Sequence, residues 1–345
     1  MFPKSLNIIN FLLLLIYFLY HNTLYTKKLN NGTIIMTFQI TPENTQNKSA
    51  LLEYFRELGN EKLSEIRREV GNKNYKEIAA CINKAINKTK HDFLHTIVEN
   101  ANQNNWNDQD KLSSLLFTTY CAHVVMLDLR HEVWPYEYMA FSRRIGELWE
   151  DFVRLPFLYA PKAAELTSFV PPLFSEVRKS LKRDIEEYID TLSISQEQKH
   201  ELIKYYEKVW VLVDSGEISL ELDFHAIIRG KRFNIDFKSG FGSNEKGNTN
   251  RLLMVATIYC NLEDEYNNIL LVRAKEDLNN NYFRTLKNSH VWNAYCGDEA
   301  YEKIGDFTHF DIQNWINSNI DWQNDLLSTT VSDLQKSNLM GYLQW

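Results

Sequence analysis

Apolar residues recur every three or four positions over several long stretches of the chain, and this period predicts helices. The three stretches nearest the N-terminus contain no proline and little glycine, so nothing in them interrupts a helix. The predicted helices span 48–70, 74–102, 108–128, 137–155, a segment that Pro171–Pro172 opens and that ends near Thr191, 195–209 and 248–260. The first three form an N-terminal helical region.

Between residues 218 and 240 the period changes to two, in the segment ISLELDFHAIIRGKRFNIDFKSG. Alternation of this kind predicts strands, here 218–229 and 232–239, joined by a tight Arg-Gly-Lys turn. The apolar positions are Ile218, Leu220, Leu222, Phe224, Phe233, Ile235 and Phe237. Each strand therefore has one apolar face and one polar face.

Shorter apolar runs predict a strand at 210–214 and another at 268–274. The order strand–strand–strand–helix–strand, framed by helices, is that of an α/β fold with a small mixed sheet. The rest of the chain mixes helices with loops. Its aromatic residues around Trp292, Trp315 and Trp322 are expected to cover the sheet.

Composition narrows this picture only in part. The 345 residues, 44% of them hydrophobic, suffice for one large or two modest folded domains. The net charge of -7 does not argue for nucleic acid, but a local positive surface is enough for DNA contact. Overall charge therefore does not discriminate between the function classes.

No two of the four cysteines form a Cys-x-x-Cys pair, so the sequence argues against a structural zinc site. Cys121 and Cys260 lie in apolar surroundings and are expected to be core thiols. This usage fits a reducing compartment, and we expect the protein to be cytoplasmic.

The N-terminus carries an apolar run from Phe11 to Tyr20, which is shorter than the roughly 20 residues of a membrane-spanning helix. No small-residue cleavage site of a signal peptide follows it. We expect residues 1–35 to be a hydrophobic leader or a mis-assigned start ahead of Met36, with a membrane anchor as the alternative. On either explanation they do not belong to the fold.

The polar faces of the two predicted strands carry Glu221, Asp223, Asp236 and Lys238. If the strands are neighbours, three carboxylates and one amine converge on one patch. Oxygen ligands with a lysine beside them are suited to a divalent cation and to chemistry on a phosphate.

Asp223, followed on the next strand by Asp236-Phe237-Lys238, resembles the PD-(D/E)xK nuclease superfamily. The resemblance is close over 218–240 and loose over the last two-thirds of the chain, and Leu222 stands where the family has proline. It implies a restriction-endonuclease-like core with Mg²⁺ bound by Asp223 and Asp236. It further implies Lys238 as the residue that positions or activates water, and Glu221 is the reserve ligand.

The helix predicted at 137–155 contains Gly146-x-x-x-Glu150, which is similar to a pattern that many members of the superfamily carry before the core strands. The resemblance implies an auxiliary catalytic role for Glu150. The alternative is an ordinary amphipathic helix with exposed acids.

The stretch SGFGSNEKGNTNR that follows Lys238 is rich in glycine, amides and hydroxyls. Amide and guanidinium groups can bond base edges, and glycine lets the backbone approach a phosphate. The candidate DNA contacts are Ser239, Asn244, Lys246, Asn248, Asn250 and Arg251. An ordinary flexible loop is the alternative, whereas a nucleotide-binding P-loop is disfavoured because Asn248 stands where that motif needs lysine.

The expected protein is thus a Mg²⁺-dependent, site-specific double-stranded DNA endonuclease, most like a type II restriction enzyme. The helical region would span 36–130 and the nuclease domain 131–345. The resemblance implies a homodimer, with a cognate DNA methyltransferase as functional partner. Two alternatives stay open: a nuclease of repair, recombination or phage defence, and a non-enzymatic helical interaction protein or membrane-anchored protein.

Overall fold

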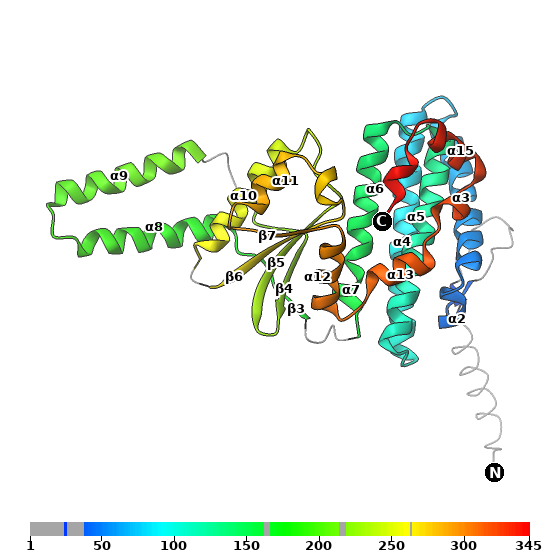
Figure 1. Ribbon diagram of the computed structural model, residues 1–345, viewed down its shortest axis with the longest axis horizontal. Coiled ribbons are helices and arrows are strands. Elements are labelled where there is room, and N and C mark those ends of the chain that lie inside the picture. The colour runs from blue at the N-terminus through cyan, green and yellow to red at the C-terminus, as the bar shows by residue number, and fades with distance from the viewer. Residues whose placement is uncertain (1–23, 26–37, 162–165, 214–218, 263) are drawn as a thin grey trace, which may run out of the picture. The chain divides into compact units, whose positions relative to one another are not determined.

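The protein has an α/β fold, in which an N-terminal helical region is followed by a five-stranded mixed sheet flanked by helices (Figure 1). The computed structural model describes residues 24–25, 38–161, 166–213, 219–262 and 264–345. Contacts divide the chain into two compact units, one comprising Met1–Ala163 and Tyr301–Trp345 and the other Ala164–Ala300. The second unit holds the predicted catalytic strands, and the first holds the predicted helix with Glu150.

The first unit is almost entirely helical. Its elements are β1 (Leu24–Tyr25), β2 (Phe38–Gln39), α2 (Pro42–Thr45), α3 (Lys48–Val70), α4 (Tyr75–Gln103), α5 (Asp108–Val133), α6 (Tyr138–Val153), α7 (Leu155–Tyr159), most of α12 (Asp298–Thr308), α13 (Ile312–Asn319), α14 (Trp322–Asp325), α15 (Ser328–Lys336) and a final 3₁₀ turn (Met340–Leu343). The helices expected from the apolar period are present here with closely similar bounds.

Helix α5 is the central helix of this unit. Among the described residues it alone is long and apolar enough to cross a membrane by length and composition, but 94% of its apolar window is buried inside the protein. Helix α3 crosses it closely at Gly59, where a Cβ atom would lie 2.5 Å from Leu129 Cδ1. The long apolar stretch is therefore the core helix of the first unit.

The C-terminal segment returns to α3 and α5 and is held there by buried polar contacts. Asp325 Oδ2 lies 2.7 Å from Lys48 Nζ and accepts a 2.8 Å hydrogen bond from the Tyr120 hydroxyl. Buried ion pairs with this many partners fix a chain segment in one place. The chain from Tyr301 onward thus completes the helical unit.

Two of the three tryptophans expected on the sheet pack elsewhere. The ring centroids of Trp315 and Phe117 are 4.9 Å apart, and those of Trp322 and Tyr120 are 4.8 Å apart, so both tryptophans pack on α5. The expectation that they cover the sheet is wrong, because the segment that carries them belongs to the other unit. Trp292 is buried in the core beside the sheet, as expected.

The second unit is built on the mixed sheet. Its elements are β3 (Leu166–Ser168), α8 (Phe174–Thr191), α9 (Gln196–Val213), β4 (Phe224–Ile228), β5 (Lys231–Lys238), α10 (Lys246–Cys260), β6 (Tyr266–Val272), a 3₁₀ turn (Glu276–Leu278), α11 (Asn281–Lys287) and β7 (Asn293–Cys296). The strand order is β3-β4-β5-β6-β7, antiparallel up to β5 and parallel beyond it. The edge strands β3 and β7 were not predicted, because they are too short to show a period.

Strands β4 and β5 form the predicted hairpin. Arg229 and Gly230 both have positive φ, 52° and 76°, which suits a two-residue turn that follows the twist of the strands. The turn sets Phe224 opposite Ile235. In this register the polar positions of the two strands share one face.

Strand β4 begins later in the chain than the alternation predicts. In the observed register a further rung would pair Leu222 with Phe237. Instead, the Leu222 N–H donates to His225 Nε2 at 2.9 Å, and the Phe237 N–H donates to Asp223 Oδ2 at 2.8 Å. The Phe237 carbonyl accepts from Lys238 Nζ at 2.8 Å. Because side chains take these backbone groups, residues 219–223 form a loop and not a strand.

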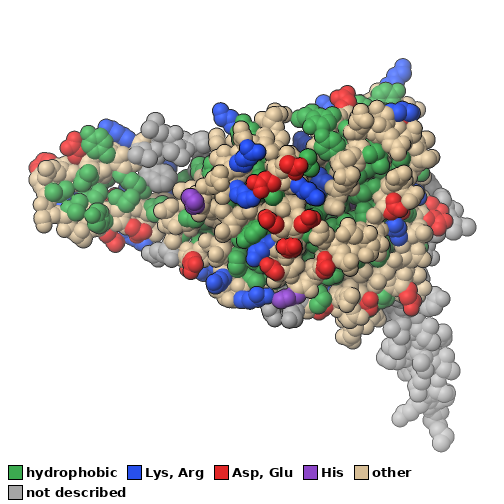
Figure 2. Space-filling view, viewed as in Figure 1, with side chains coloured by type: hydrophobic (Ala, Val, Ile, Leu, Met, Phe, Trp, Pro, Cys, Tyr) green, Lys and Arg blue, Asp and Glu red, His purple; other side chains and the backbone are tan. Residues whose placement is uncertain are grey.

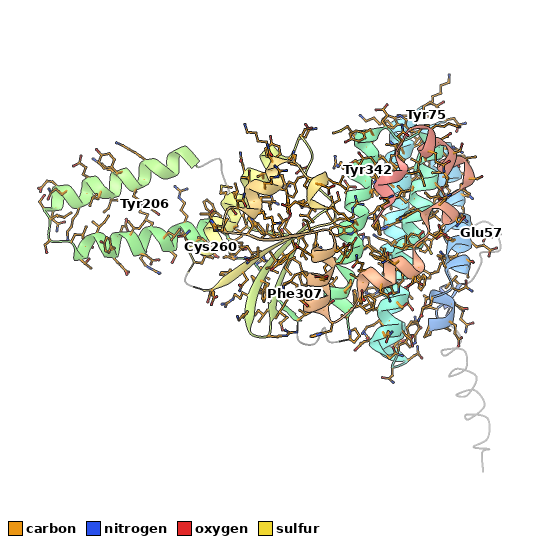
Figure 3. The ribbon with its side chains drawn as sticks, in the orientation of Figure 1. Glu57, Tyr75, Tyr206, Cys260, Phe307 and Tyr342 are labelled. Carbon is orange, nitrogen blue, oxygen red and sulfur yellow. The ribbon has the colours of Figure 1, made fainter. Side chains whose placement is uncertain are left out.

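Helices α8 and α9 form a hairpin, called the arm here (Figure 1). In the sequence the arm lies between β3 and β4, which pair with each other in the sheet. The strand expected at 210–214 is wrong, because α9 continues to Val213. Tyr206 lies on this helix (Figure 3). Hydrophobic side chains gather along the arm in Figure 2. Tyr188 and Tyr205, which belong to the arm, are exposed.

Two smaller expectations need correction. Residues 1–35 were expected to lie outside the fold, but Leu24–Tyr25 pairs antiparallel with Phe38–Gln39. The rest of residues 1–35 lies outside the described residues. Cys121 is buried as expected, but Cys260 is exposed at the C-terminal end of α10 (Figure 3), where its sulfur accepts a 3.5 Å hydrogen bond from Asn268 Nδ2 of β6.

Candidate active site

The candidate site lies at the C-terminal end of β5, on the face of the sheet that α10 covers. Asn234, Asp236 and Lys238 alternate along β5 on this face, as the period of two requires. Asn234 and Asp236 are fully buried, and so are Ile235 and Phe237 on the opposite face. At these two positions the polar face is therefore shielded from solvent, unlike the polar face of a plain surface hairpin.

The structure brings three of the predicted residues together. Lys238 Nζ lies 2.8 Å from Asp236 Oδ1 and 3.4 Å from Asp223 Oδ2. Asp223 reaches this position from the loop before β4, where its carboxylate accepts the Phe237 N–H. Lys238 and Asp223 are partly accessible, with side-chain exposures of 16% and 35%. Solvent thus reaches the amine and one carboxylate, while the second carboxylate lies beneath them.

Asp236 is an ionisable group held in an environment that disfavours its charge. Among the described residues neither of its carboxylate oxygens receives a hydrogen bond of good geometry, although Lys238 is close enough for an ion pair. Burial raises the pKa of Asp236 to about 6, against the opposing attraction of the Lys238 ammonium, and the nearby Asp223 raises it further. A buried, under-bonded carboxylate at an accessible amine is a common sign of a functional site.

Arg251, on α10, approaches Asp236 from another side. Its Nη2 lies 3.7 Å from Asp236 Oδ2, and its Nη1 lies 3.4 Å from the backbone oxygen of Glu221. The Glu221 side chain is exposed. Among the described residues no group of three or more His, Cys, Asp or Glu side chains is arranged to hold a metal ion, so the third expected carboxylate is not gathered with the two aspartates.

A divalent cation fits the two aspartates in chemical terms. Hard cations such as Mg²⁺ take oxygen ligands, often only one or two carboxylates together with water. The unbonded Asp236 oxygens and the partly exposed Asp223 carboxylate supply such ligands. The positive charges of Lys238 and Arg251 already balance the negative charges of the two aspartates. A bound dication would therefore displace one of these two basic side chains or share its carboxylate contact.

The candidate DNA contacts lie next to this site, and four of them are on a helix. Lys246, Asn248, Asn250 and Arg251 belong to the first two turns of α10, which begins earlier than predicted. Asn244, Lys246 and Asn250 are exposed, and Ser239 is half-buried. The Asn248 side chain donates to Glu245 Oε2 at 3.1 Å, and Arg251 contacts Asp236. The exposed members, Asn244, Lys246 and Asn250, are called the polar rim here; they precede Arg251 in the sequence, and Arg251 contacts Asp236.

Glu150 lies on α6 in the first unit and is half-buried. The three strand residues belong to the second unit. Its auxiliary role stays a prediction.

Sequence reasoning missed a buried polar chain beside the site. His225 Nδ1 lies 2.8 Å from Asn234 Oδ1, and Asn234 Nδ2 donates to Asn268 Oδ1 at 2.9 Å. Burial lowers the pKa of His225 despite its hydrogen bond with Asn234, which favours the neutral imidazole. The signal was present in part, since His225 and Asn234 occupy polar positions that a tight turn places opposite each other.

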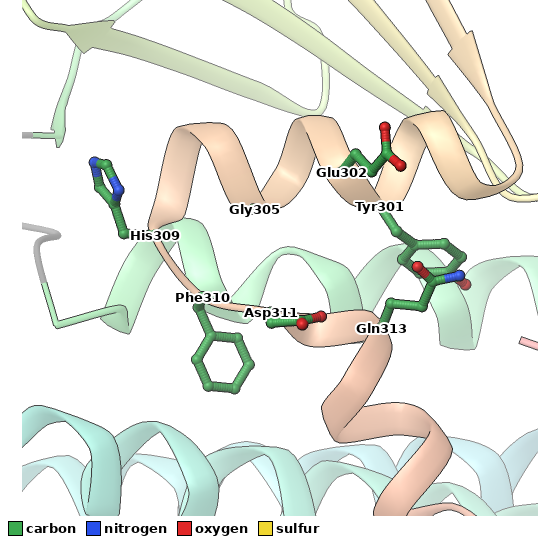
Figure 4. Close-up of a pocket in the computed structure, with 7 residues that line it drawn as sticks. All are labelled: Tyr301, Glu302, Gly305, His309, Phe310, Asp311 and Gln313. Carbon is green, nitrogen blue, oxygen red and sulfur yellow. The ribbon is translucent and has the colours of Figure 1, made fainter.

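A separate surface pocket of about 380 Å³ lies in the first unit, between α12 and α13 (Figure 4). Its lining includes Glu302, His309 and Asp311, but in Figure 4 His309 and Glu302 point away from Asp311. This pocket therefore does not bring a catalytic set together.

Comparisons of the chain with protein-family models, with curated proteins and with solved structures found no match. The functional argument therefore rests on the geometry of the site.

Proposed function

We propose that this protein is a Mg²⁺-dependent endonuclease that hydrolyses phosphodiester bonds of double-stranded DNA, as a type II restriction enzyme does. The observation that carries the proposal is the meeting of Asp223, Asp236 and Lys238, with the ammonium 2.8 and 3.4 Å from the two carboxylates. Convergence of two acids and one amine at the accessible end of a buried strand is suited to phosphate chemistry.

Asp236 and Asp223 are the residues that would hold the cation. Bound there, Mg²⁺ would supply Lewis-acid polarisation of the phosphate and an acidified water. The buried position of Asp236 makes its charge strongly attractive to a cation, because little water competes with it. Asp223, at the surface of the site, can turn between the cation and its present hydrogen bond with Phe237.

Lys238 is the residue that faces both carboxylates and solvent. Its ammonium can orient a water towards a phosphorus atom and stabilise the negative charge that develops on the phosphate oxygens. Because its contact with Asp236 restrains it, the amine is already positioned before substrate arrives.

The rim of Asn244, Lys246 and Asn250 is the surface that the proposal assigns to DNA. Lysine binds the phosphate backbone, and asparagine can bond adenine bidentately. On the face shown in Figure 2, acidic and basic side chains are interspersed, so contact with DNA would be local to this rim. A homodimer acting on both strands belongs to the same proposal.

Two other functions compete with this one. A nuclease of repair, recombination or phage defence would use the same three residues, and only its substrate would differ. An interaction protein has the arm in its favour, since Tyr188 and Tyr205 are 66% and 56% exposed on it.

A digest tests the proposal. Full-length protein is incubated with Mg²⁺ and phage or plasmid DNA, methylated and unmethylated, beside Asp236→Ala, Lys238→Ala and an EDTA control. Lys231→Ala is the matched control, because Lys231 is an exposed lysine at the other end of β5. Discrete bands from wild type and Lys231→Ala, absent in the other samples, are the expected result.

Other outcomes separate the alternatives. Cleavage confined to ends, flaps or junctions, and still lost in Asp236→Ala, would show that the protein is a nuclease of DNA repair and not a restriction enzyme. No metal-dependent cleavage of any DNA would overturn the nuclease proposal.

A further inference from the structure

We infer that His225, Asn234 and Asn268 form a hydrogen-bonded chain whose role is to position Asp223. The inference rests on the proposed function, in which Asp223 is a ligand of the site. It adds three positioning residues, none of which touches the cation or the phosphate.

The chain runs straight across three neighbouring strands. His225 and Asn234 are register partners on β4 and β5, and Asn234 and Asn268 are register partners on β5 and β6. Their side chains are 7%, 0% and 2% exposed. Partners directly opposite each other on one face are close enough to bond, which explains the 2.8 and 2.9 Å contacts.

Every group in the chain has a partner of the correct kind. The Leu222 N–H donates to His225 Nε2, so the imidazole proton resides on Nδ1 and is donated to Asn234 Oδ1. The Asn268 amide then donates to the backbone oxygens of Ala256 and Val291, at 3.3 and 3.1 Å. The chain is thus anchored on α10 and on the segment before β7.

The free end of the chain holds the loop that carries Asp223. The bond to the Leu222 N–H fixes the residue immediately before Asp223. Two side chains of α10 hold the loop further back: the Tyr259 hydroxyl bonds the Leu220 oxygen at 2.9 Å, and Arg251 bonds the Glu221 oxygen. The His225 bond also keeps the Leu222 N–H out of the β4–β5 ladder.

This arrangement decides where the Asp223 carboxylate goes. With the rung between Leu222 and Phe237 left open, the Phe237 N–H is available to Asp223, whose carboxylate then lies beside Lys238. Apolar residues at the three chain positions would fill the same space without matched partners. A fully satisfied polar network instead selects one arrangement of the groups that it connects.

Two substitutions of His225 separate positioning from packing. His225→Leu removes the acceptor of the Leu222 N–H, whereas His225→Gln keeps one acceptor and one donor in similar places. In His225→Leu we expect amide hydrogen exchange in peptides spanning 219–224 to become at least about tenfold faster, and Mn²⁺ binding to weaken about tenfold. His225→Gln should restore both to within about threefold of wild type. Asn234→Leu, which cuts the chain one step further away, should give an intermediate effect.

Ile228→Ala is the matched control. Ile228 is buried at the other end of β4, opposite Lys231, so its truncation weakens the same strand and leaves the bond between His225 and the Leu222 N–H in place. Selective loop exchange in His225→Leu, absent in Ile228→Ala and reversed in His225→Gln, supports the inference. Unchanged loop exchange in His225→Leu, or equal changes in Ile228→Ala, would overturn it. Exchange does not require catalysis, so a protein that cleaves no DNA refutes the proposed function without deciding this result.

Discussion

Each compact unit buries a charged cluster, and the two clusters are built in opposite ways. In the helical unit Lys90 of α4 contacts Asp151 of α6, with His123 of α5 beside them; the Lys90 and His123 nitrogens are 3.4 Å apart. In the sheet unit Lys238 lies between Asp223 and Asp236. Both clusters combine carboxylate and amine groups, but the pKa of a carboxylate is shifted in opposite directions in the two.

The helical cluster favours the charge of its carboxylate. Burial opposes ionisation of Asp151, but the hydrogen bond with His123 and the attraction of Lys90 outweigh it and hold the pKa of Asp151 well below its usual range. Burial and Lys90 lower the pKa of His123 to about 4, so the imidazole is neutral at pH 7. The buried Lys90 ammonium thus has a satisfied counter-ion, as a structural ion pair requires.

The sheet cluster disfavours the charge of its carboxylate, since the pKa of Asp236 is raised to about 6. Its oxygens are buried without hydrogen bonds of good geometry among the described residues. The comparison teaches that a buried carboxylate held against its preference is the better candidate for binding a cation.

Activity should separate the clusters most strongly. Asp236→Asn should lower Mg²⁺-dependent cleavage on the order of 10³-fold, because it removes a charge on which the cation depends. Asp151→Asn, assayed where circular dichroism shows it folded, should stay within about threefold of wild type, since Asp151 pairs with Lys90 and His123 of the helical unit. Steady-state cleavage of one plasmid substrate measures both. Equal losses of cleavage activity in Asp236→Asn and Asp151→Asn would show that the two clusters do not differ in function.

Stability should show the reverse ranking. Asp151→Asn leaves the Lys90 charge buried without its counter-ion, and we expect the free energy of unfolding to fall by about 2 kcal/mol at pH 7. This figure is below the range for fully buried pairs because the Asp151 side chain is 44% exposed and water screens it. Urea titrations measure the change.

The sign with pH follows from the lowered pKa of Asp151. Its contribution is present above the pKa of the unfolded chain and is lost as the pH falls towards the lower folded value. Adding Lys90→Met to Asp151→Asn should recover part of the loss. A double variant no more stable than Asp151→Asn would show that the pair does not act as a unit.

Asp236→Asn should stabilise the protein at pH 8 by about 1.5 kcal/mol. Folding raises the pKa of Asp236 to about 6, so its favourable contribution is present below the unfolded value of 3.8 and is lost as the pH rises through about 6. The full difference corresponds to about 3 kcal/mol, and we expect about half of it because the buried amide must find hydrogen-bond partners of its own. Urea titrations at pH 8 and pH 4 should show the gain only at pH 8. A destabilised variant at pH 8 would mean that Asp236 is a structural partner, like Asp151.

Mg²⁺ should stabilise the wild type by about 1 kcal/mol at five times its dissociation constant, because it binds the folded state. The stabilisation should grow between pH 5 and 7 as Asp236 ionises, and it should be absent in Asp236→Asn. Thermal unfolding with and without Mg²⁺ measures it, with Asp151→Asn as the matched carboxylate control. Equal stabilisation of Asp236→Asn would place the cation elsewhere.

Local patterns in the sequence were enough for much of this molecule. The period of apolar residues predicted the long helices, and the alternation predicted a tight Arg-Gly-Lys turn, of which Arg229 and Gly230 form the observed turn. Alternation placed Asp223, Asp236 and Lys238 on one face of a hairpin. These features depend on neighbours a few residues apart, which is why the sequence reveals them.

Tertiary structure decided the features that depend on distant partners. The short strands β3 and β7 exist only because β4 and β6 offer them backbone groups, and Trp315 and Trp322 pack on α5 because the chain returns there after Tyr301. Strand β4 begins only at Phe224 because side chains take the backbone N–H groups of Leu222 and Phe237, which would otherwise extend the ladder.

The same division applies to the candidate site. The sequence by itself determined which acids and amine could meet, since the period of a strand and the length of a turn are local properties. Only the tertiary structure decided that Asp236 is buried under α10, that Glu221 points to solvent and that His225 is bonded through Asn234 to Asn268. Burial and pKa depend on the groups that long-range packing places around a side chain, and no local pattern specifies them.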